Sequence, residues 1–122
     1  MFSVLIAVAA GAAQPNCKDP QTEIDMNICA SRAFKGADVR MTRQYNLIAA
    51  RMKKMDAGEA GYFGALLESQ RAWLKYREAQ CRFEGYTTHG GTAESLNVDA
   101  CRIDLTDKRT KDLKSLLEAF GN

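Results

Sequence analysis

Residues 62–84 read YFGALLESQRAWLKYREAQCRFE and carry a clear helical pattern. Large side chains recur at steps of three and four residues, the spacing that places them on one face of an α-helix. The positions on this face are Phe63, Leu66, Leu67, Gln70, Trp73, Leu74, Arg77 and Cys81. Gln70 and Arg77 lie on or beside the apolar face, so we expect them to be satisfied in a semi-buried polar network rather than to bind a ligand.

An amphipathic helix of roughly 30 residues is predicted before this one. It starts after Pro20, with Asp19 or Thr22 as the N-cap, and it ends near Met55. Gly36 marks a place where this helix can bend. Its apolar face comprises Ile24, Ile28, Phe34, Ala37, Met41, Tyr45, Ile48, Met52 and Met55.

A third helix is predicted over residues 93–119, with Thr92 or Thr106 as the cap of a start or a restart. Residues 56–61 and 85–92 have the composition of a turn and a loop. Three helices with short connections make an all-α, three-helix antiparallel bundle. Residues 14–122 are long enough for one such domain.

An uncharged apolar segment precedes the predicted domain. Residues 2–13 end in small residues and match an A-x-A cleavage pattern, although no Lys or Arg comes before them. We therefore interpret residues 1–13 as a signal peptide; the alternative is an apolar N-terminal element of the mature fold. No lipobox precedes Cys17, so we expect a soluble periplasmic or secreted protein without stable membrane insertion after cleavage.

Four cysteines, Cys17, Cys29, Cys81 and Cys101, predict two disulfides in an exported domain of this size. They can pair in three ways. Helix geometry favours Cys17–Cys29, which pins the N-terminal segment, and Cys81–Cys101, which braces the loop of residues 85–92. The sequence contains one His and no C-x-x-C, so neither a metal site nor a redox motif nor a cofactor is expected.

The run from Leu66 to Cys81, with QRAWLKYR at its centre, resembles the signature of the LprI-like family of small exported bacterial proteins, named for a lysozyme inhibitor. Segments around Cys17, around Tyr45 and from Gly90 to Leu113 match the family in order. Trp73, Thr106 and Arg109 lie in the segments that resemble the family. We expect them to join Gln70 and Arg77 in the structural polar network.

The resemblance implies inhibition of lysozyme. Lysozyme uses two carboxyl groups in a cleft, and an inhibitor would block that cleft with a constrained loop. The loop from Tyr86 to Ser95 is the best candidate, and it offers Thr87, Thr88, His89, Glu94 and Ser95. The alternative is that Gly90 and Gly91 simply turn the chain. Many lysozymes are basic, and a net charge of +2 does not favour long-range attraction to them.

A second hypothesis is a non-inhibitory module that binds peptidoglycan or another cell-envelope protein. Its contacts would be the five cations of residues 40–54, which are Arg40, Arg43, Arg51, Lys53 and Lys54. An enzyme is not expected, because the sequence lacks G-x-S-x-G, H-E-x-x-H and any recognisable carboxylate-pair motif. The export signal and the small net charge argue against a nucleic-acid partner.

Overall fold

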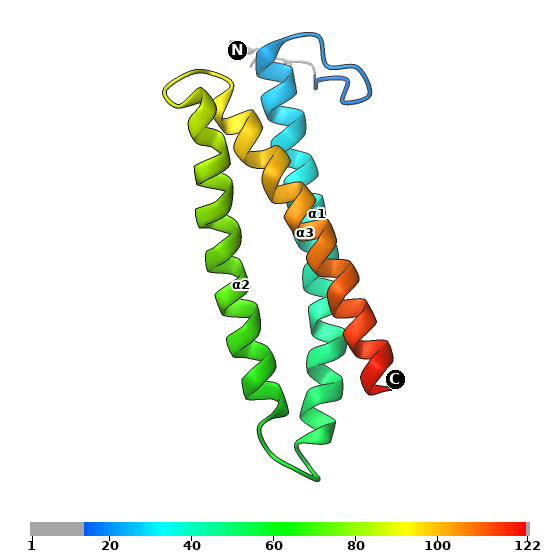
Figure 1. The fold of residues 1–122 in the computed structure, drawn as a ribbon. Helices are drawn as coiled ribbons and strands as arrows, with labels where there is room; N and C mark the ends of the chain where they lie inside the picture. Colours follow the sequence, from blue (N-terminus) through cyan, green and yellow to red (C-terminus); the bar gives the residue numbers. More distant parts are fainter. Residues whose placement is uncertain (1–13, 122) are drawn as a thin grey trace, which may run out of the picture.

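The structure is a computed structural model that describes residues 14–121, so the predicted signal peptide at residues 1–13 lies outside the described residues. Three α-helices, α1 (Glu23–Met55), α2 (Tyr62–Gly85) and α3 (Glu94–Phe120), account for most of this part of the chain, and a short 3-10 helix, η1 (Tyr86–Thr88), follows α2. Consecutive helices run antiparallel, so α1 and α3 point the same way (Figure 1). The predicted all-α, three-helix fold is confirmed.

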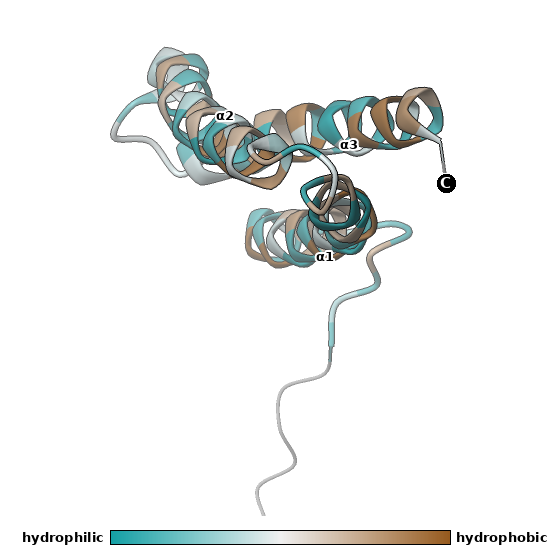
Figure 2. Cartoon of the chain, turned by 90° about the horizontal axis from the view of Figure 1, so that it is seen from below, coloured by the Kyte–Doolittle hydropathy of each residue, from teal (hydrophilic) through white to brown (hydrophobic). Residues whose placement is uncertain are grey.

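The three helices do not share their contacts equally. The interface between α1 and α3 is the most extensive, and that between α1 and α2 is the smallest. Seen from below, α2 and α3 lie on one side and α1 packs across them (Figure 2). Because α2 packs mainly on α3, the side of α2 that faces away from both helices stays exposed.

Of the two residues predicted to cap the first helix, only the second does so. Thr22 is the N-cap, and its Oγ1 accepts a hydrogen bond of 3.0 Å from the backbone N–H of Asp25. Asp19 instead belongs to a turn in which its N–H donates to the carbonyl of Asn16, so the prediction of Asp19 as the cap was wrong. The helix continues through Gly36 to Met55.

The start of α3 also differs from the predicted capping. Ala93 is the N-cap residue and makes no side-chain capping bond, so Thr92 does not cap this helix. Thr106 lies in the middle of an unbroken helix and is completely buried. Thr106 therefore cannot cap a restart; its hydroxyl has a partner on α2 instead, as described below.

The first turn of α2 is capped by a residue of the preceding turn. The carboxylate of Asp56 accepts the N–H of Tyr62 at 2.8 Å and that of Phe63 at 3.3 Å. Gly61, between them, has a φ of 116°, a value that side-chain-bearing residues rarely adopt. The turn thus satisfies two backbone donors that a helix start otherwise leaves unpaired.

The apolar core lies between the parts of the three helices that are farther from the α2–α3 connection (lower half of Figure 1). Its buried residues are Met41, Ile48, Met52 and Leu113, and Trp73, Leu66 and Leu117 pack against them. Ile24 and Ile28, both on the predicted apolar face of α1, are 72% and 37% exposed. The predicted apolar face of α1 is therefore not buried over its whole length, because no other described part of the chain covers that side of its first turns.

The two predicted disulfides, Cys17–Cys29 and Cys81–Cys101, are both present, with Cα–Cα distances of 5.4 Å. Both lie toward the end of the molecule that holds the α2–α3 connection (Figure 1). We call this the loop end and define it as residues 14–38 and 78–105. The opposite end comprises residues 39–77 and 106–121.

Candidate functional site

A buried arginine joins the three helices at mid-height. The Arg77 side chain is 7% exposed, and its Nη1 donates to Asp38 Oδ1 on α1 at 2.9 Å and to Thr106 Oγ1 on α3 at 3.1 Å. Its guanidinium also lies 4.9 Å from the ring centre of Phe34 and 5.4 Å from that of Trp73. Such stacking and fork-like hydrogen bonding suit Arg rather than Lys.

Glu78 extends this cluster to a second arginine. Its carboxylate accepts hydrogen bonds from Arg77 Nε at 3.1 Å and from Arg102 Nη2 at 2.5 Å. Arg102 also donates to Asp99 at 3.3 Å. Burial by itself raises the pKa of Glu78, but the hydrogen bonds and positive charges of Arg102 and Arg77 outweigh it and lower the pKa below its usual value.

The other predicted members of the polar network lie one turn away. Arg109 Nε donates to Gln70 Oε1 at 3.0 Å, and its guanidinium lies 5.7 Å from the ring centre of Trp73. Gln70 is only 7% exposed and its amide contacts the sulfur of Met41. Trp73 therefore separates two hydrogen-bonded groups, Arg77 with Thr106 and Gln70 with Arg109. These contacts support a role in holding α2 against α3.

The α2–α3 loop is closed by hydrogen bonds as well as by Cys81–Cys101. The hydroxyl of Thr87 donates to the carbonyl of Glu84, and that of Thr88 donates to the carbonyl of Gly85. Thr88 Oγ1 also accepts the amide of Asn97 at 2.9 Å. Both threonine hydroxyls therefore use their protons within the loop.

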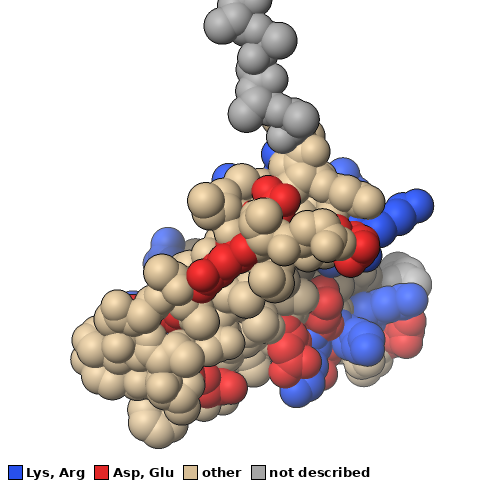
Figure 3. All heavy atoms as spheres, turned by 90° about the horizontal axis from the view of Figure 1, so that it is seen from above, with Lys and Arg blue, Asp and Glu red and all other residues tan. Residues whose placement is uncertain are grey.

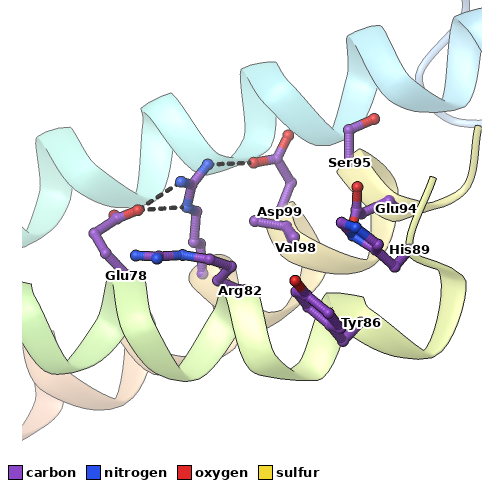
Figure 4. Close-up of a pocket in the computed structure, with 9 residues that line it drawn as sticks. Glu78, Arg82, Tyr86, His89, Glu94, Ser95, Val98 and Asp99 are labelled. Atoms are coloured by element: carbon purple, nitrogen blue, oxygen red, sulfur yellow. Dashed lines mark hydrogen bonds and ion pairs between the residues drawn. The ribbon is translucent and has the colours of Figure 1, made fainter.

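A hollow of about 540 Å³ opens between the end of α2, the loop and the start of α3. We call it the loop hollow; it is lined by Glu78, Arg82, Tyr86, His89, Glu94, Ser95, Val98, Asp99 and Arg102. Figure 4 shows these side chains converging from α2, the connecting loop and α3, with the Glu78–Arg102–Asp99 ion pairs along one wall. The hollow is therefore polar and carries charges of both signs.

His89 and Tyr86 form one side of the loop hollow. Their rings stack with centres 4.2 Å apart and planes within 6°. Nδ1 of His89 lies 2.6 Å from Glu94 Oε2. Ser95 donates to Asn27 on α1 at 3.3 Å, which ties the start of α3 to the first helix.

The structure brings together only some of the predicted loop residues. His89, Glu94 and Ser95 line the hollow, whereas Thr87 and Thr88 do not. Sequence reasoning missed Arg82, which is exposed and has no ion-pair partner among residues 14–121. Its position directly after Cys81, at the base of the closed loop, is the sequence signal that could have identified it.

Gly85 allows α2 and α3 to approach each other beside this hollow. A Cβ atom at position 85 would lie 2.6 Å from Val98 Cγ2, well inside the normal contact distance. The close approach of the helix backbone therefore requires glycine here.

Charge is divided between the two ends of the molecule. Among the described residues, the loop end holds nine acidic and five basic side chains, a net charge of −4, whereas the opposite end holds six acidic and twelve basic ones, a net charge of +6. Figure 3 views the loop end and shows carboxylates spread over this face, with Lys and Arg gathered along one side. The overall charge of +2 conceals this separation.

The five cations proposed for an envelope-binding surface are partly engaged within the protein. Arg40 pairs with Asp107 at 3.5 Å, and Lys53 lies 4.6 Å from the ring centre of Phe63. Arg51 donates to the carbonyl of Phe120. Arg43 and Lys54 have no ion-pair partner in the part of the chain that the structure describes.

Neither a metal site nor a membrane span is found in residues 14–121. No three His, Cys, Asp or Glu side chains there are grouped as metal ligands would be. None of the three helices combines the length and the apolar character needed to cross a bilayer.

Residues 15–113 match the family model described as lysozyme inhibitor LprI. The chain belongs to the LprI family. This match includes both disulfides, the Arg77 cluster and the whole loop hollow. An uncharacterised protein of Rhizobium meliloti (strain 1021) is 37% identical over 116 residues, which cover 89% of this chain and 84% of that protein.

No solved structure matches this family member significantly. Its family is described as that of a lysozyme inhibitor. Its two disulfides fit an oxidising, extracytoplasmic compartment.

Proposed function

We propose that this protein is an exported, non-enzymatic lysozyme inhibitor that places its α2–α3 loop in the active-site cleft of the enzyme. The observation that carries the proposal is a disulfide-closed loop at the negatively charged end of an LprI family member. Lysozyme cleaves its glycan with two carboxyl groups in a cleft, so an inhibitor has to occupy or cover that cleft.

The rigidity of the loop supports this role. The Cys81–Cys101 bond closes it at the base, and the hydrogen bonds of Thr87 and Thr88 hold its first turn. Ordering a mobile side chain on binding costs about 0.5–1.5 kcal/mol, so a loop that is already ordered retains more of its contact energy as affinity.

Two side chains, one on α2 just before the loop and one in the loop, have the chemistry to contact carboxyl groups. Arg82 is permanently charged and can donate to both oxygens of a carboxylate. His89 uses Nδ1 toward Glu94, and its Nε2 has no partner among the described residues. An imidazole nitrogen can donate a hydrogen bond to a carboxylate or accept one from a carboxylic acid, according to the tautomer. Arg82 and His89 are therefore the proposed contacts with the catalytic carboxyl groups.

The charge of the loop end supports an encounter with a basic enzyme. A net charge of −4 on this end would orient the protein so that the loop approaches a positively charged lysozyme first. The total charge of +2 alone does not favour long-range attraction to a basic enzyme, but it does not include this separation of charge between the two ends. Added salt would slow association by screening the attraction.

The test is titration of the purified protein into lysozymes of several classes acting on cell-wall suspensions. We expect inhibition of at least one class, weakened about tenfold by Arg82→Ala, which corresponds to about 1.4 kcal/mol. Arg71→Ala is the matched control, because it removes the same charge from an exposed position of α2 outside the loop hollow.

No inhibition of any lysozyme would reject the proposal. Equal effects of the two arginine variants would move the site away from the loop. Salt-sensitive binding to wall material without any effect on lysozyme would favour the envelope-binding hypothesis instead.

A further inference from the structure

The outward side of α2 carries a second apolar face. Tyr76 and Phe83, in the C-terminal half of α2, and Tyr86, the C-cap residue that follows it, are 53%, 72% and 58% exposed. With Ala79, which is also exposed, they follow each other at steps of three, four and three residues. At 3.6 residues per turn these positions share one side of the helix, opposite the side that buries Arg77. We call this set of four residues the α2 stripe.

The α2 stripe is continuous with the loop hollow. A second hollow, of about 360 Å³, is lined by Ala79, Arg82, Phe83 and Tyr86. Arg82 and Tyr86 also line the loop hollow, so the two depressions share a border. The ring of Tyr86 is held there by stacking on His89. A partner that covered the loop would therefore meet the α2 stripe directly, with Arg82 and Tyr86 at the border between the two surfaces.

The composition of this surface is that of a binding surface. Aromatic residues and Arg are enriched among the residues that dominate binding energy, and they cluster near the centre of an interface. Exposed Phe and Tyr side chains without such a role are usually scattered singly. Here they are aligned, and Arg82, which has no ion-pair partner among the residues that the structure describes, lies beside them.

The loop alone is too small to form a stable interface, so an enzyme that binds the loop would also contact the surface beside it. A specific complex typically buries about 800 Å² on each side, contributed by about 20–30 residues. The segment from Tyr86 to Ser95 is much shorter than that, so a loop-bound enzyme needs an adjoining surface. Three of the four stripe residues, Ala79, Phe83 and Tyr86, lie at the net negative loop end, whose charge complements a basic enzyme.

We infer that the α2 stripe is the apolar centre of the lysozyme-binding surface, on the rim of the cleft that the loop enters. This inference rests on the proposed function and extends it from the loop to the outer side of α2. The loop would then supply the polar contacts inside the cleft, and Phe83 would supply most of the apolar burial outside it.

The test compares the removal of two large apolar side chains with the same exposed fraction. Phe83→Ala removes a side chain that is 72% exposed, and Ile24→Ala removes one that is equally exposed but lies on α1. Affinity for an inhibited lysozyme is measured by calorimetry, with thermal unfolding as the check on folding. We expect Phe83→Ala to weaken binding about 30-fold, as a residue at the centre of an interface does. Ile24→Ala should stay within about twofold of the wild type. Tyr76→Ala is a second stripe variant and should weaken binding in the same direction.

The outcomes separate this inference from the proposed function. Wild-type affinity in Phe83→Ala and Tyr76→Ala, with weakened inhibition in Arg82→Ala, would overturn the inference and leave the inhibitor proposal standing. Absence of lysozyme binding by the wild type would overturn both. Two other results would assign the stripe to another occupant and overturn the inference. In the first, sedimentation shows a dimer that Phe83→Ala dissociates, while the affinity for lysozyme is unchanged. In the second, Phe83→Ala abolishes binding of glycan, again with unchanged affinity for lysozyme.

Discussion

Gly85→Ala is expected to have opposite effects in two backgrounds. Alanine fits the backbone at this position, because φ and ψ of −70° and −16° are helical. Its Cβ, however, would lie 2.6 Å from Val98 Cγ2. Valine is branched at Cβ and has little rotamer freedom, so it cannot turn aside without cost. The contacts with Glu94, at 3.6 and 3.7 Å, are ordinary and add no strain.

The magnitude follows from two opposing terms. Overpacking of this kind costs about 1–3 kcal/mol. Replacing Gly by Ala in a helix gains up to about 1 kcal/mol. The free energy of unfolding should therefore fall by about 1 kcal/mol in Gly85→Ala. With Val98→Ala already present, the clashing methyl group is gone, and Gly85→Ala should raise stability by up to about 1 kcal/mol.

The assay is denaturant unfolding of the four proteins with disulfides intact, analysed as a double-mutant cycle. The reasoning requires the sign of the Gly85→Ala effect to change with Val98. A decrease of the same size in both backgrounds would refute it, because the cost would then come from the backbone rather than from the Val98 contact.

Two further predictions concern single carboxylates. Asp56→Ala should lower the free energy of unfolding by about 1–2 kcal/mol, because it leaves the first N–H groups of α2 without their cap. Glu59→Ala, in the same turn, is the control. Equal denaturation midpoints for the two variants would contradict the capping role of Asp56. The folded state lowers the pKa of Glu78, so its contribution to stability is complete above the unfolded value near 4.5 and is lost as pH falls through the folded pKa. Glu78→Gln should therefore lose less stability than the wild type on acidification below about pH 4.5, measured by denaturation at a series of pH values; parallel pH profiles would show that Glu78 is not responsible.

The positions of the helices could be read from the sequence because the information is local. The step of three or four residues and the breaks at residues 56–61 and 85–92 placed α2 within one residue of its observed end. The pairing of the cysteines followed from the same helices, because an antiparallel hairpin brings Cys81 and Cys101 together.

What the sequence pattern did not reveal depends on which surfaces are covered. Periodicity identified Ile24 as part of an apolar face but could not show that no other part of residues 14–121 packs there. It left Phe83 off the apolar face of α2 but did not show that this side chain joins Tyr76 and Tyr86 in an exposed row. The loop hollow needs side chains from two helices and a loop, and Arg82 could be recognised only after they were assembled.

The two disulfides also have a consequence for the order of folding. In the oxidised, unfolded chain, loops that span 12 and 20 residues are already closed, and both belong to the loop end. The largest interface, between α1 and α3, instead joins residues as distant as Arg40 and Asp107, which are 67 positions apart. Contacts between residues that are far apart in sequence form slowly, because closing the long loop between them costs conformational entropy before the contacts stabilise the chain. We therefore expect the α2–α3 hairpin to form first and the docking of α1 to set the folding rate.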